Sequence, residues 1–259
     1  TVVLDHEEPL TAEQRRAVDR TVRERVGMSV LEESDATTTV QILLDSAEVS
    51  VLQSIRQLAF IVLSRQRTAI DSLSNTAGRE EFVGRDQQAD RLTSMVNRSV
   101  ARGLTDLEEI DALGATRPEL FESWSVIREL ECVLDAAEGV VTAAARMDDR
   151  ASETQLETSR ELAREACSIV SDGVSVFVGD DGVDAARRAL DKRDRTAADI
   201  DEFDRQLTEA EASATELRFV LDRLREIARY GGKIAELGLQ KAVRRRESIA
   251  TRAAEQPSQ

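Results

Sequence analysis

The chain has 259 residues with 50 acidic and 35 basic side chains, a net charge of −15, and only 3% aromatic residues. A chain of this length can bury a large core without disulfide or metal staples. A core poor in aromatics must consist of Leu, Val, Ile and Ala, which favours packed helices over a sandwich or barrel. The negative charge repels nucleic-acid phosphates, so we expect no nucleic-acid binding by this region alone.

The basic residues are almost all arginine, since the only lysines are Lys192, Lys233 and Lys241. An acidic, lysine-poor surface is typical of proteins from a high-salt cytoplasm, where screening weakens the repulsion between carboxylates. The alternative is an ordinary acidic protein from a GC-rich genome, in which arginine also replaces lysine. We favour the halophilic interpretation.

Signals for disulfides, membrane insertion and catalysis are weak. Cys132 and Cys167 are too few for a disulfide framework, and the longest apolar run, 59–63, is far too short to span a membrane. We expect a cytoplasmic protein, because no signal peptide is recognisable. His6 is the only histidine, which argues against Ser-His, Cys-His and Glu-x-x-His sites, so we expect no enzyme. The chain starts without Met, directly in a strand-like run, so we expect further residues upstream in the intact protein.

Residues 1–44 predict a small β-α-β-β unit. Val2–Leu4 is a short β-type run, and Thr11 with Gln14 fits a capping box that opens a helix. Two further β-type runs follow that helix, over Met28–Glu33 and Thr37–Leu43.

Residues 45–148 predict a first three-helix unit. A helix-start signal at Asp45 precedes apolar residues at i, i+3, i+4 and i+7 spacing, and this helix should stop near Ser74. A second helix is expected over 77–102. Thr116 and Glu119 form another capping box, which opens a third helix reaching about Met147.

Residues 152–250 repeat this layout and predict a second three-helix unit, followed by a polar tail over 251–259. Its helices are expected from Ser152 to about Gly179, from Val183, and from Ala214 to about Arg246. The best local match pairs 85–89 with 193–197, 108 residues later. The fold class is therefore mainly α, with two tandem three-helix repeats behind the β-α-β-β unit. Gly231 and Gly232 lack the spacing of a phosphate loop, and we expect them to allow close helix–helix approach.

Two pairs of carboxylates have helical i, i+4 spacing. Asp86 and Asp90 lie in the second predicted helix, and Glu131 and Asp135 in the third, so each pair projects from one helix face. If the two faces pack together, four carboxylates converge, and a divalent or trivalent cation would relieve their repulsion. The alternative is a solvated face of an acidic helix.

The matching positions of the second repeat differ. Asp194 is retained, but the position four residues later is Ala198, and Arg225 and Arg229 occupy the places of Glu131 and Asp135. A guanidinium there would repel a metal and could pair with Asp194 instead. We therefore expect the first repeat to keep a metal site and the second to have exchanged it for ion pairs.

Three stretches of the chain resemble the PhoU family of phosphate-uptake regulators, and within it the halophilic archaeal members. They are Arg-Asp-Gln-Gln-Ala-Asp-Arg-Leu over 85–92, Leu-Glu-Cys-Val-Leu-Asp-Ala-Ala over 130–137, and Ile-Ala-Arg-Tyr-Gly-Gly-Lys-Ile-Ala-Glu over 227–236. The resemblance covers about 45–241, and the β-α-β-β unit also looks like the segment that precedes the bundle in those members.

The resemblance implies metal ions held by acid-x-x-x-acid motifs, which Asp86 with Asp90 and Glu131 with Asp135 match. It does not distinguish Mg, Mn, Fe and Zn. In the second repeat the family usually has Asp at the place of Arg229 and Asn at that of Lys233. Glu236 keeps its place, so a degenerate second site would comprise Asp194, Arg225, Arg229 and Glu236.

The resemblance further implies a negative regulator of phosphate uptake, acting through the ATPase of a phosphate ABC transporter or through a signalling protein. It also implies a homo-oligomer, and halophilic members often carry an AbrB-like DNA-binding domain upstream of the bundle. Two other hypotheses stay open. One is a structural or oligomerisation module attached to a DNA-binding head, and the other is a metal-dependent hydrolase that uses the carboxylates.

Overall fold

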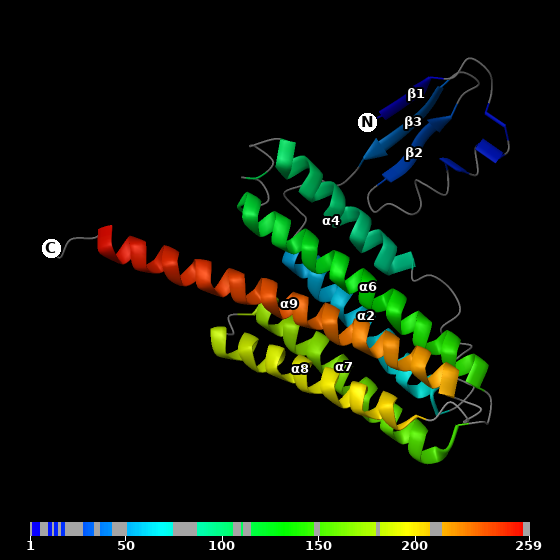
Figure 1. Ribbon diagram of the computed structural model, residues 1–259. Helices are drawn as coiled ribbons and strands as arrows, with labels where there is room; N and C mark the ends of the chain where they lie inside the picture. The colour runs from blue at the N-terminus through cyan, green and yellow to red at the C-terminus, as the bar shows by residue number, and fades with distance from the viewer. Residues whose placement is uncertain are drawn as a thin grey trace. The chain divides into compact units, whose positions relative to one another are not determined.

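The computed structural model of the chain is mainly helical in its described part, as the composition predicts (Figure 1). The described residues are 2–5, 10–11, 13–14, 17–18, 28–33, 37–42, 51–74, 87–105, 110, 115–147, 151–179, 182–207 and 214–255. The chain divides into two compact units, which are described separately below. The first comprises Thr1–Ser54 and Arg85–Trp124, and the second Ile55–Gly84 and Ser125–Gln259.

The first unit contains a three-stranded antiparallel sheet with the strand order β1-β3-β2. Its strands are β1 (Val2–Asp5), β2 (Met28–Glu33) and β3 (Thr37–Ile42), close to the predicted runs. Val2 pairs with Val40 in β3, while a register shift interrupts the β2–β3 ladder between Val30 and Glu32. Most of the helix expected between β1 and β2 lies outside the described residues, so the β-α-β-β unit as a whole stays a prediction.

Local capping interactions occur where the sequence predicts them. The Thr11 amide donates to Gln14 Oε1 at 2.9 Å, and the Gln14 amide donates to Thr11 Oγ1 at 3.3 Å. The same reciprocal pattern joins Thr116 to Glu119, with distances of 2.8 and 3.4 Å. Each box satisfies two backbone amides that the first helical turn leaves unpaired.

The first unit also holds α4 (Gln87–Thr105) and the first turns of α6 (Arg117–Met147). Ala89, Leu92, Val96 and Val100 are the buried apolar residues of α4. The sequence predicts a start at 77, but residues 75–86 lie outside the described part. The helix continues to Thr105, three residues beyond the predicted end at Arg102.

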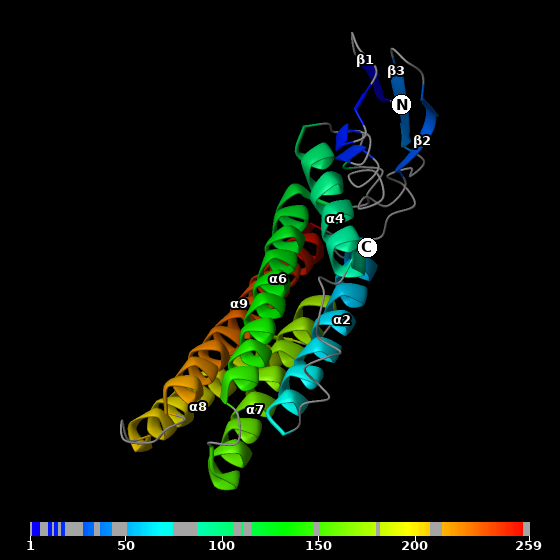
Figure 2. The same ribbon diagram turned by 90° about the vertical axis from the view of Figure 1, so that its right-hand side faces the viewer.

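The second unit contains α2 (Val51–Ser72) from Ile55 onward, the rest of α6, α7 (Glu153–Val178), α8 (Val183–Gln206) and α9 (Ala214–Glu255). The last three pack on one another and lie side by side in both views (Figure 1, Figure 2). The core is mostly aliphatic, and its buried aromatic residues in the described part are Phe177 and Phe203. Its largest fully buried side chains are Ile55, Leu58, Ile127, Leu130, Ile169, Phe177, Ile200, Leu217, Leu221, Leu224 and Ile234.

Glycines bring α7 and α9 into close contact. A Cβ atom added at Gly173 would lie 2.6 Å from the carbonyl oxygen of Gly231, and one at Gly231 would lie 2.8 Å from the amide nitrogen of Val170. One at Gly238 would lie 3.0 Å from the amide nitrogen of Phe177. Backbone atoms cannot rotate out of the way, so only glycine permits this approach. The expected role of Gly231 in close helix packing is confirmed.

The compact units do not follow the predicted repeats. The three helices expected for 152–250 do pack together, but those expected for 45–148 are divided, since α4 belongs to the first unit while α2 from Ile55 onward and most of α6 belong to the second. The tandem repeat therefore stays a prediction.

The last helix is longer than the sequence analysis expected. Residues 251–255, assigned there to the polar tail, continue α9 to Glu255. The segment is rich in alanine and has no glycine or proline before Pro257, so its helix propensity is high. Proline disfavours the helical conformation in the residue before it, which accounts for the end of the helix near this point. No helix within the described ranges is long and apolar enough to cross a membrane.

The α7–α9 contact predicts opposite outcomes for two glycine substitutions. We expect Gly231→Ala to destabilise the protein by about 1–3 kcal/mol, because the clash with backbone of α7 outweighs the gain of about 1 kcal/mol in helix propensity. Gly139→Ala in α6 is the matched control. Its Cβ would lie 2.6 Å from the side chain of Arg223, and this side chain can move aside. We therefore expect Gly139→Ala to keep or slightly raise the stability, through the gain in helix propensity. Urea unfolding followed by circular dichroism measures both, and equal stabilities would contradict the close contact.

Candidate functional site

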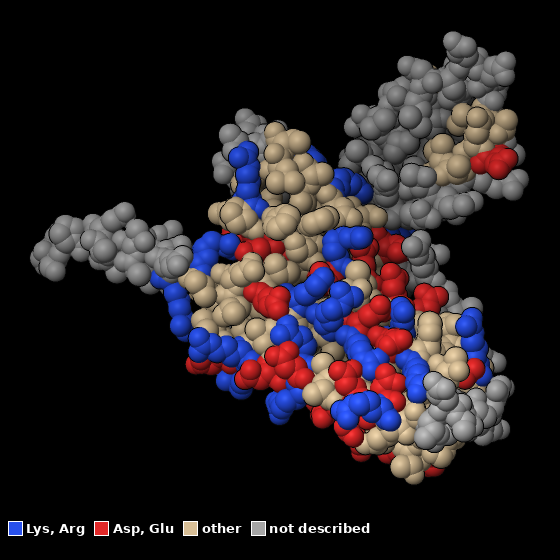
Figure 3. Space-filling model, in the orientation of Figure 1, with Lys and Arg blue, Asp and Glu red and all other residues tan. Residues whose placement is uncertain are grey.

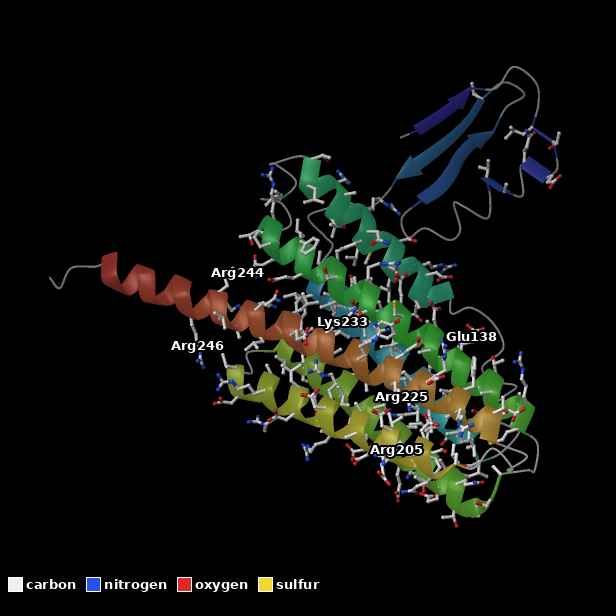
Figure 4. All side chains as sticks on the ribbon, in the orientation of Figure 1. Glu138, Arg205, Arg225, Lys233, Arg244 and Arg246 are labelled. Atoms are coloured by element: carbon white, nitrogen blue, oxygen red, sulfur yellow. The ribbon has the colours of Figure 1, made fainter. Side chains whose placement is uncertain are left out.

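Four residues form a polar seam between α6 and α9 in the second unit, called here the α6–α9 seam: Glu129, Cys132, Tyr230 and Lys233. The Lys233 ammonium donates to Glu129 Oε1 at 3.2 Å, which joins residues 104 positions apart in the chain. Lys233 and Arg229 also approach the Tyr230 ring, with their cationic centres 5.5 and 4.5 Å from its centroid. Figure 4 shows Lys233 on α9. The seam lies within or next to the two later stretches that carry the family resemblance.

Burial affects both cysteine thiols of the second unit. Burial raises the pKa of the Cys132 thiol and the charge of Glu129 adds to that effect, although a hydrogen bond from Tyr230 opposes it. Burial likewise raises the pKa of Cys167. Both thiols therefore stay protonated near neutral pH, and a thiol is a poor nucleophile. Glu129 Oε2 is buried and has no hydrogen-bond partner among the described residues.

Glu131 and Asp135 lie one helical turn apart on α6, as predicted. Glu131 is partly neutralised, because its Oε2 accepts from Arg128 at 2.7 Å. Asp135 is exposed and forms no ion pair with any described residue. Of the two carboxylates, Glu131 is therefore paired with an arginine, and Asp135 is exposed to solvent.

The other predicted pair is described only in part. Asp90 lies in the first turn of α4, half-buried, whereas Asp86 lies outside the described residues. Asp90 belongs to the first unit, and Glu131 and Asp135 to the second. Among the described residues no three acidic, histidine or cysteine side chains gather as a metal site. The four-carboxylate cluster accordingly stays a prediction.

The retained acids of the predicted second site share one arginine that the sequence analysis missed. Arg193 on α8 donates from Nε to Asp194 at 2.9 Å and from NH1 to Glu236 on α9 at 2.8 Å. The hydrogen bond to Asp194 is the main cause that raises the pKa of Arg193 above its ordinary value. Gly232 makes room for this bridge, since a Cβ there would clash with Cδ of Arg193.

Arg225 forms a separate cluster toward the other end of α8. It donates to Asp201 at 2.9 Å, to Asp204 at 2.7 Å and to Asp222 at 2.6 Å. Arg218 adds a second contact to Asp204 at 3.2 Å. Figure 4 shows Arg225 on α9 beside α8.

The expected pairing of Asp194 with Arg225 or Arg229 is therefore wrong, because Asp194 pairs with Arg193 instead. α8 and α9 run antiparallel, so the contacts of Arg225 with Asp204 and of Glu236 with Arg193 fix a single register. Asp194 lies ten residues from Asp204, which is about 15 Å along a helix and too far for an ion pair with Arg225. Arg229 is exposed and lies over the ring of Tyr230.

One sequence signal could have found the Arg225 cluster. Arg218 and Arg225 are seven residues apart, and Asp201 and Asp204 are three apart, so each pair occupies one helix face. The choice of facing helices, however, has no local signature.

Comparisons with known proteins add no identification. The chain matches no protein-family model and no curated protein. The family resemblance therefore rests on its motifs and helix layout.

The Arg225 cluster predicts a pH-dependent contribution to stability. The hydrogen bond from Arg225 is the main cause that lowers the pKa of Asp204. Because the folded-state pKa is below the unfolded one, this stabilisation is full above the ordinary aspartate pKa of about 3.9 and is lost as the pH falls through the lower folded value. We expect Asp204→Asn to lose about 1–2 kcal/mol at neutral pH, and to approach wild type in acid.

Urea unfolding across a pH series measures this difference. Asp191→Asn is the control on the same helix, since Asp191 is exposed, lies away from the helix ends and forms no ion pair with any described residue, so it should have wild-type stability at neutral pH. A deficit of Asp204→Asn that is the same at pH 3 and pH 7 would contradict the assignment.

The carboxylate pairs predict unequal metal loss between the repeats. We expect Asp86→Asn with Asp90→Asn, or Glu131→Gln with Asp135→Asn, to weaken Mn²⁺ binding at least tenfold, because hard cations need oxygen ligands. Asp194→Asn with Glu236→Gln should leave it unchanged, since Arg193 already neutralises both acids. Calorimetric titration of chelator-treated protein with Mn²⁺ measures the three variants. Equal loss in all of them would refute the division of roles.

Proposed function

We propose that the chain is a PhoU-like regulator of phosphate uptake, a metal-binding adaptor that contacts other proteins and restrains a phosphate transporter or its signalling programme. In this role it makes and breaks protein contacts and carries out no chemical conversion. The partner classes are the ATPase of a phosphate ABC transporter and a signalling protein of the same response.

One observation carries the proposal: the two later stretches of the resemblance meet at the α6–α9 seam. Residues 130–137 and 227–236 are far apart in the chain, yet Lys233 pairs with Glu129 beside the first stretch. A chance likeness of short motifs gives no reason for them to be neighbours in space. Their contact is what a shared bundle architecture would require.

The surface of the second unit also suits an adaptor. On the face shown in Figure 3, basic and acidic side chains alternate over α8 and α9. Several of these charges sit in exposed ion pairs, such as Arg205 with Glu202 and Arg164 with Glu157. Exposed pairs contribute little to folding stability, which leaves them available for recognition of a partner with complementary charge.

The experiment is affinity purification of the full-length protein at the salt concentration of its cytoplasm, from phosphate-replete and phosphate-starved cells. We expect recovery of a phosphate-transporter ATPase or a signalling protein in amounts that change with phosphate. Glu131→Gln with Asp135→Asn should reduce that recovery at least tenfold. Glu138→Gln is the matched control, because Glu138 is an exposed acid on the same helix outside both motifs.

Three outcomes would contradict this function. Recovery of the same partners in equal amounts under both conditions would remove the phosphate dependence. A stable homo-oligomer that brings down no partner would favour the structural or oligomerisation module attached to a DNA-binding head. Sustained phosphoester turnover by the metal-loaded protein would instead revive the hydrolase hypothesis.

A further inference from the structure

An open groove of about 610 Å³ lies between α7 and α8 in the second unit. It spans 158–165 of α7 and 199–206 of α8, which is about 10 Å or two helical turns. Leu162 and Phe203 form its floor and are 7% and 8% exposed. Its walls are polar and include four acids, which are Glu161 and Glu165 on α7 and Asp199 and Glu202 on α8.

Three of these acids keep their charge uncompensated, and we call them the three groove carboxylates. Glu161, Glu165 and Asp199 are exposed and form no ion pair with any described residue. Glu202 differs from them, because it pairs with Arg205 at 2.6 Å. Figure 4 labels Arg205 near the C-terminal end of α8, where the groove lies.

The packing of α7 on α8 does not require this excess of acid. Lys192 of α8, about two turns from Asp199, bridges the same two helices by donating to Asp172 of α7. At that level a cation neutralises an acid across the helix contact. Among the described residues that line the groove, the only cation is Arg164, and Glu157 of its own helix holds it at 3.1 Å.

The three groove carboxylates also lie near one another along the helices. Glu161 and Glu165 are one turn apart on α7, so they project from one face. α7 and α8 run antiparallel, and the contact of Lys192 with Asp172 sets their register. Asp199 lies seven residues after Lys192 and Glu165 seven before Asp172, so these two acids lie level on opposite walls. Like charges in this arrangement repel, and a bound cationic group relieves the repulsion.

The spread of the carboxylates suits an extended cation better than a metal ion. No three acidic, histidine or cysteine side chains of the described residues gather closely enough to hold one ion. Basic side chains one turn apart on a helix are about 5–6 Å from each other, which is the spacing of Glu161 and Glu165 on α7. The aliphatic stem of an arginine can also lie on apolar surface while its guanidinium reaches a carboxylate, so it would cover Leu162 and Phe203.

We propose that the α7–α8 groove binds a basic helix of a partner protein, with arginine or lysine at positions i, i+3 and i+4 on one face. The residues at i and i+4 would pair with Glu161 and Glu165 on one wall, and the residue at i+3 with Asp199 on the other. Side chains at these three positions point within about 100° of one another, so all of them can face one groove. Arginine gives the stronger contact, because its fork donates two parallel hydrogen bonds to a carboxylate.

The inference goes beyond the regulatory function and does not rest on it. A phosphate regulator and a purely structural module would both gain a docking surface from this groove. The test uses only the full chain and a synthetic peptide, so its failure leaves the affinity purification described above unaffected.

Fluorescence anisotropy of a labelled peptide, titrated with the full chain at low and at molar salt, tests the groove. The probe is a capped alanine-based helix of about 18 residues, long enough to be helical alone, with arginines at i, i+3 and i+4. We expect Glu161→Gln with Glu165→Gln to weaken its binding at least tenfold, because two charge-assisted hydrogen-bonded contacts are lost.

A variant and a second peptide control for the net charge of −15, which attracts any cation at low salt. Glu138→Gln with Asp191→Asn removes two exposed acids outside the groove, and should bind the probe like wild type. A peptide of the same composition, with its arginines spread around the helix, should bind wild type at least fivefold more weakly, because only part of them can face the groove. Circular dichroism verifies that each variant is folded.

Four results would overturn the proposal. Absence of binding at both salt concentrations, equal weakening by the two double variants, or equal binding of the two peptides would each leave only non-specific attraction. If the probe does not bind and sedimentation velocity shows a wild-type oligomer that Glu161→Gln with Glu165→Gln dissociates, a second copy of the chain occupies the groove instead.

Discussion

The close approach of α7 and α9 is the contact on which the second unit depends. Gly173, Gly231 and Gly238 let the two backbones come nearer than any side chain would allow. Adjacent residues of a helix point about 100° apart, so Gly231 faces α7 while Gly232 faces the Arg193 stem of α8. One Gly-Gly pair therefore fixes α9 against two neighbouring helices.

Electrostatic contacts then fix the register around α9. Arg225 and Arg218 engage acids near the C-terminal end of α8, Arg193 engages Glu236 nearer its start, and Lys233 reaches across to α6. These pairs are partly exposed, so their strength depends on salt less than that of fully solvated pairs but more than that of buried ones. A chain so rich in acids gains from placing each arginine among several carboxylates, because the local repulsion between them is relieved.

The ion pairs are concentrated where α9 packs on α8, while other surfaces of the second unit keep acidic side chains that form no ion pair with any described residue. Most acids at the α8–α9 contact pair with arginine, as Asp204 does with Arg225 and Glu236 with Arg193. In contrast, Asp135 on α6 and the carboxylates of Glu161, Glu165 and Asp199 between α7 and α8 form no ion pair with any described residue. Burial raises the pKa of the Cys132 and Cys167 thiols, so neither is a strong nucleophile near neutral pH.

The sequence by itself determined the mainly helical class and the features whose interactions span a few residues. The capping boxes at Thr11 and Thr116 join residues three positions apart, so the pattern of side chains was sufficient to locate them. The positions of the three strands and the ends of α2 and α7 followed from apolar spacing and turn residues in the same way. The end of α9 did not, because helix propensity beyond Arg246 outweighed the polar character of the segment.

Only the tertiary structure decided which side chains meet across helices. The register and rotation of the packed helices decide which partners Asp194 and Arg225 have and whether Glu129 meets Lys233. They also place Glu161, Glu165 and Asp199 around one groove between α7 and α8. A shift of a few residues along one helix moves a side chain by several ångströms and turns it to another face, and no local pattern encodes that choice. The predicted metal residues illustrate the limit: helical spacing placed Glu131 and Asp135 on one face of α6, but spacing within a helix cannot specify which carboxylates of another helix come to face them.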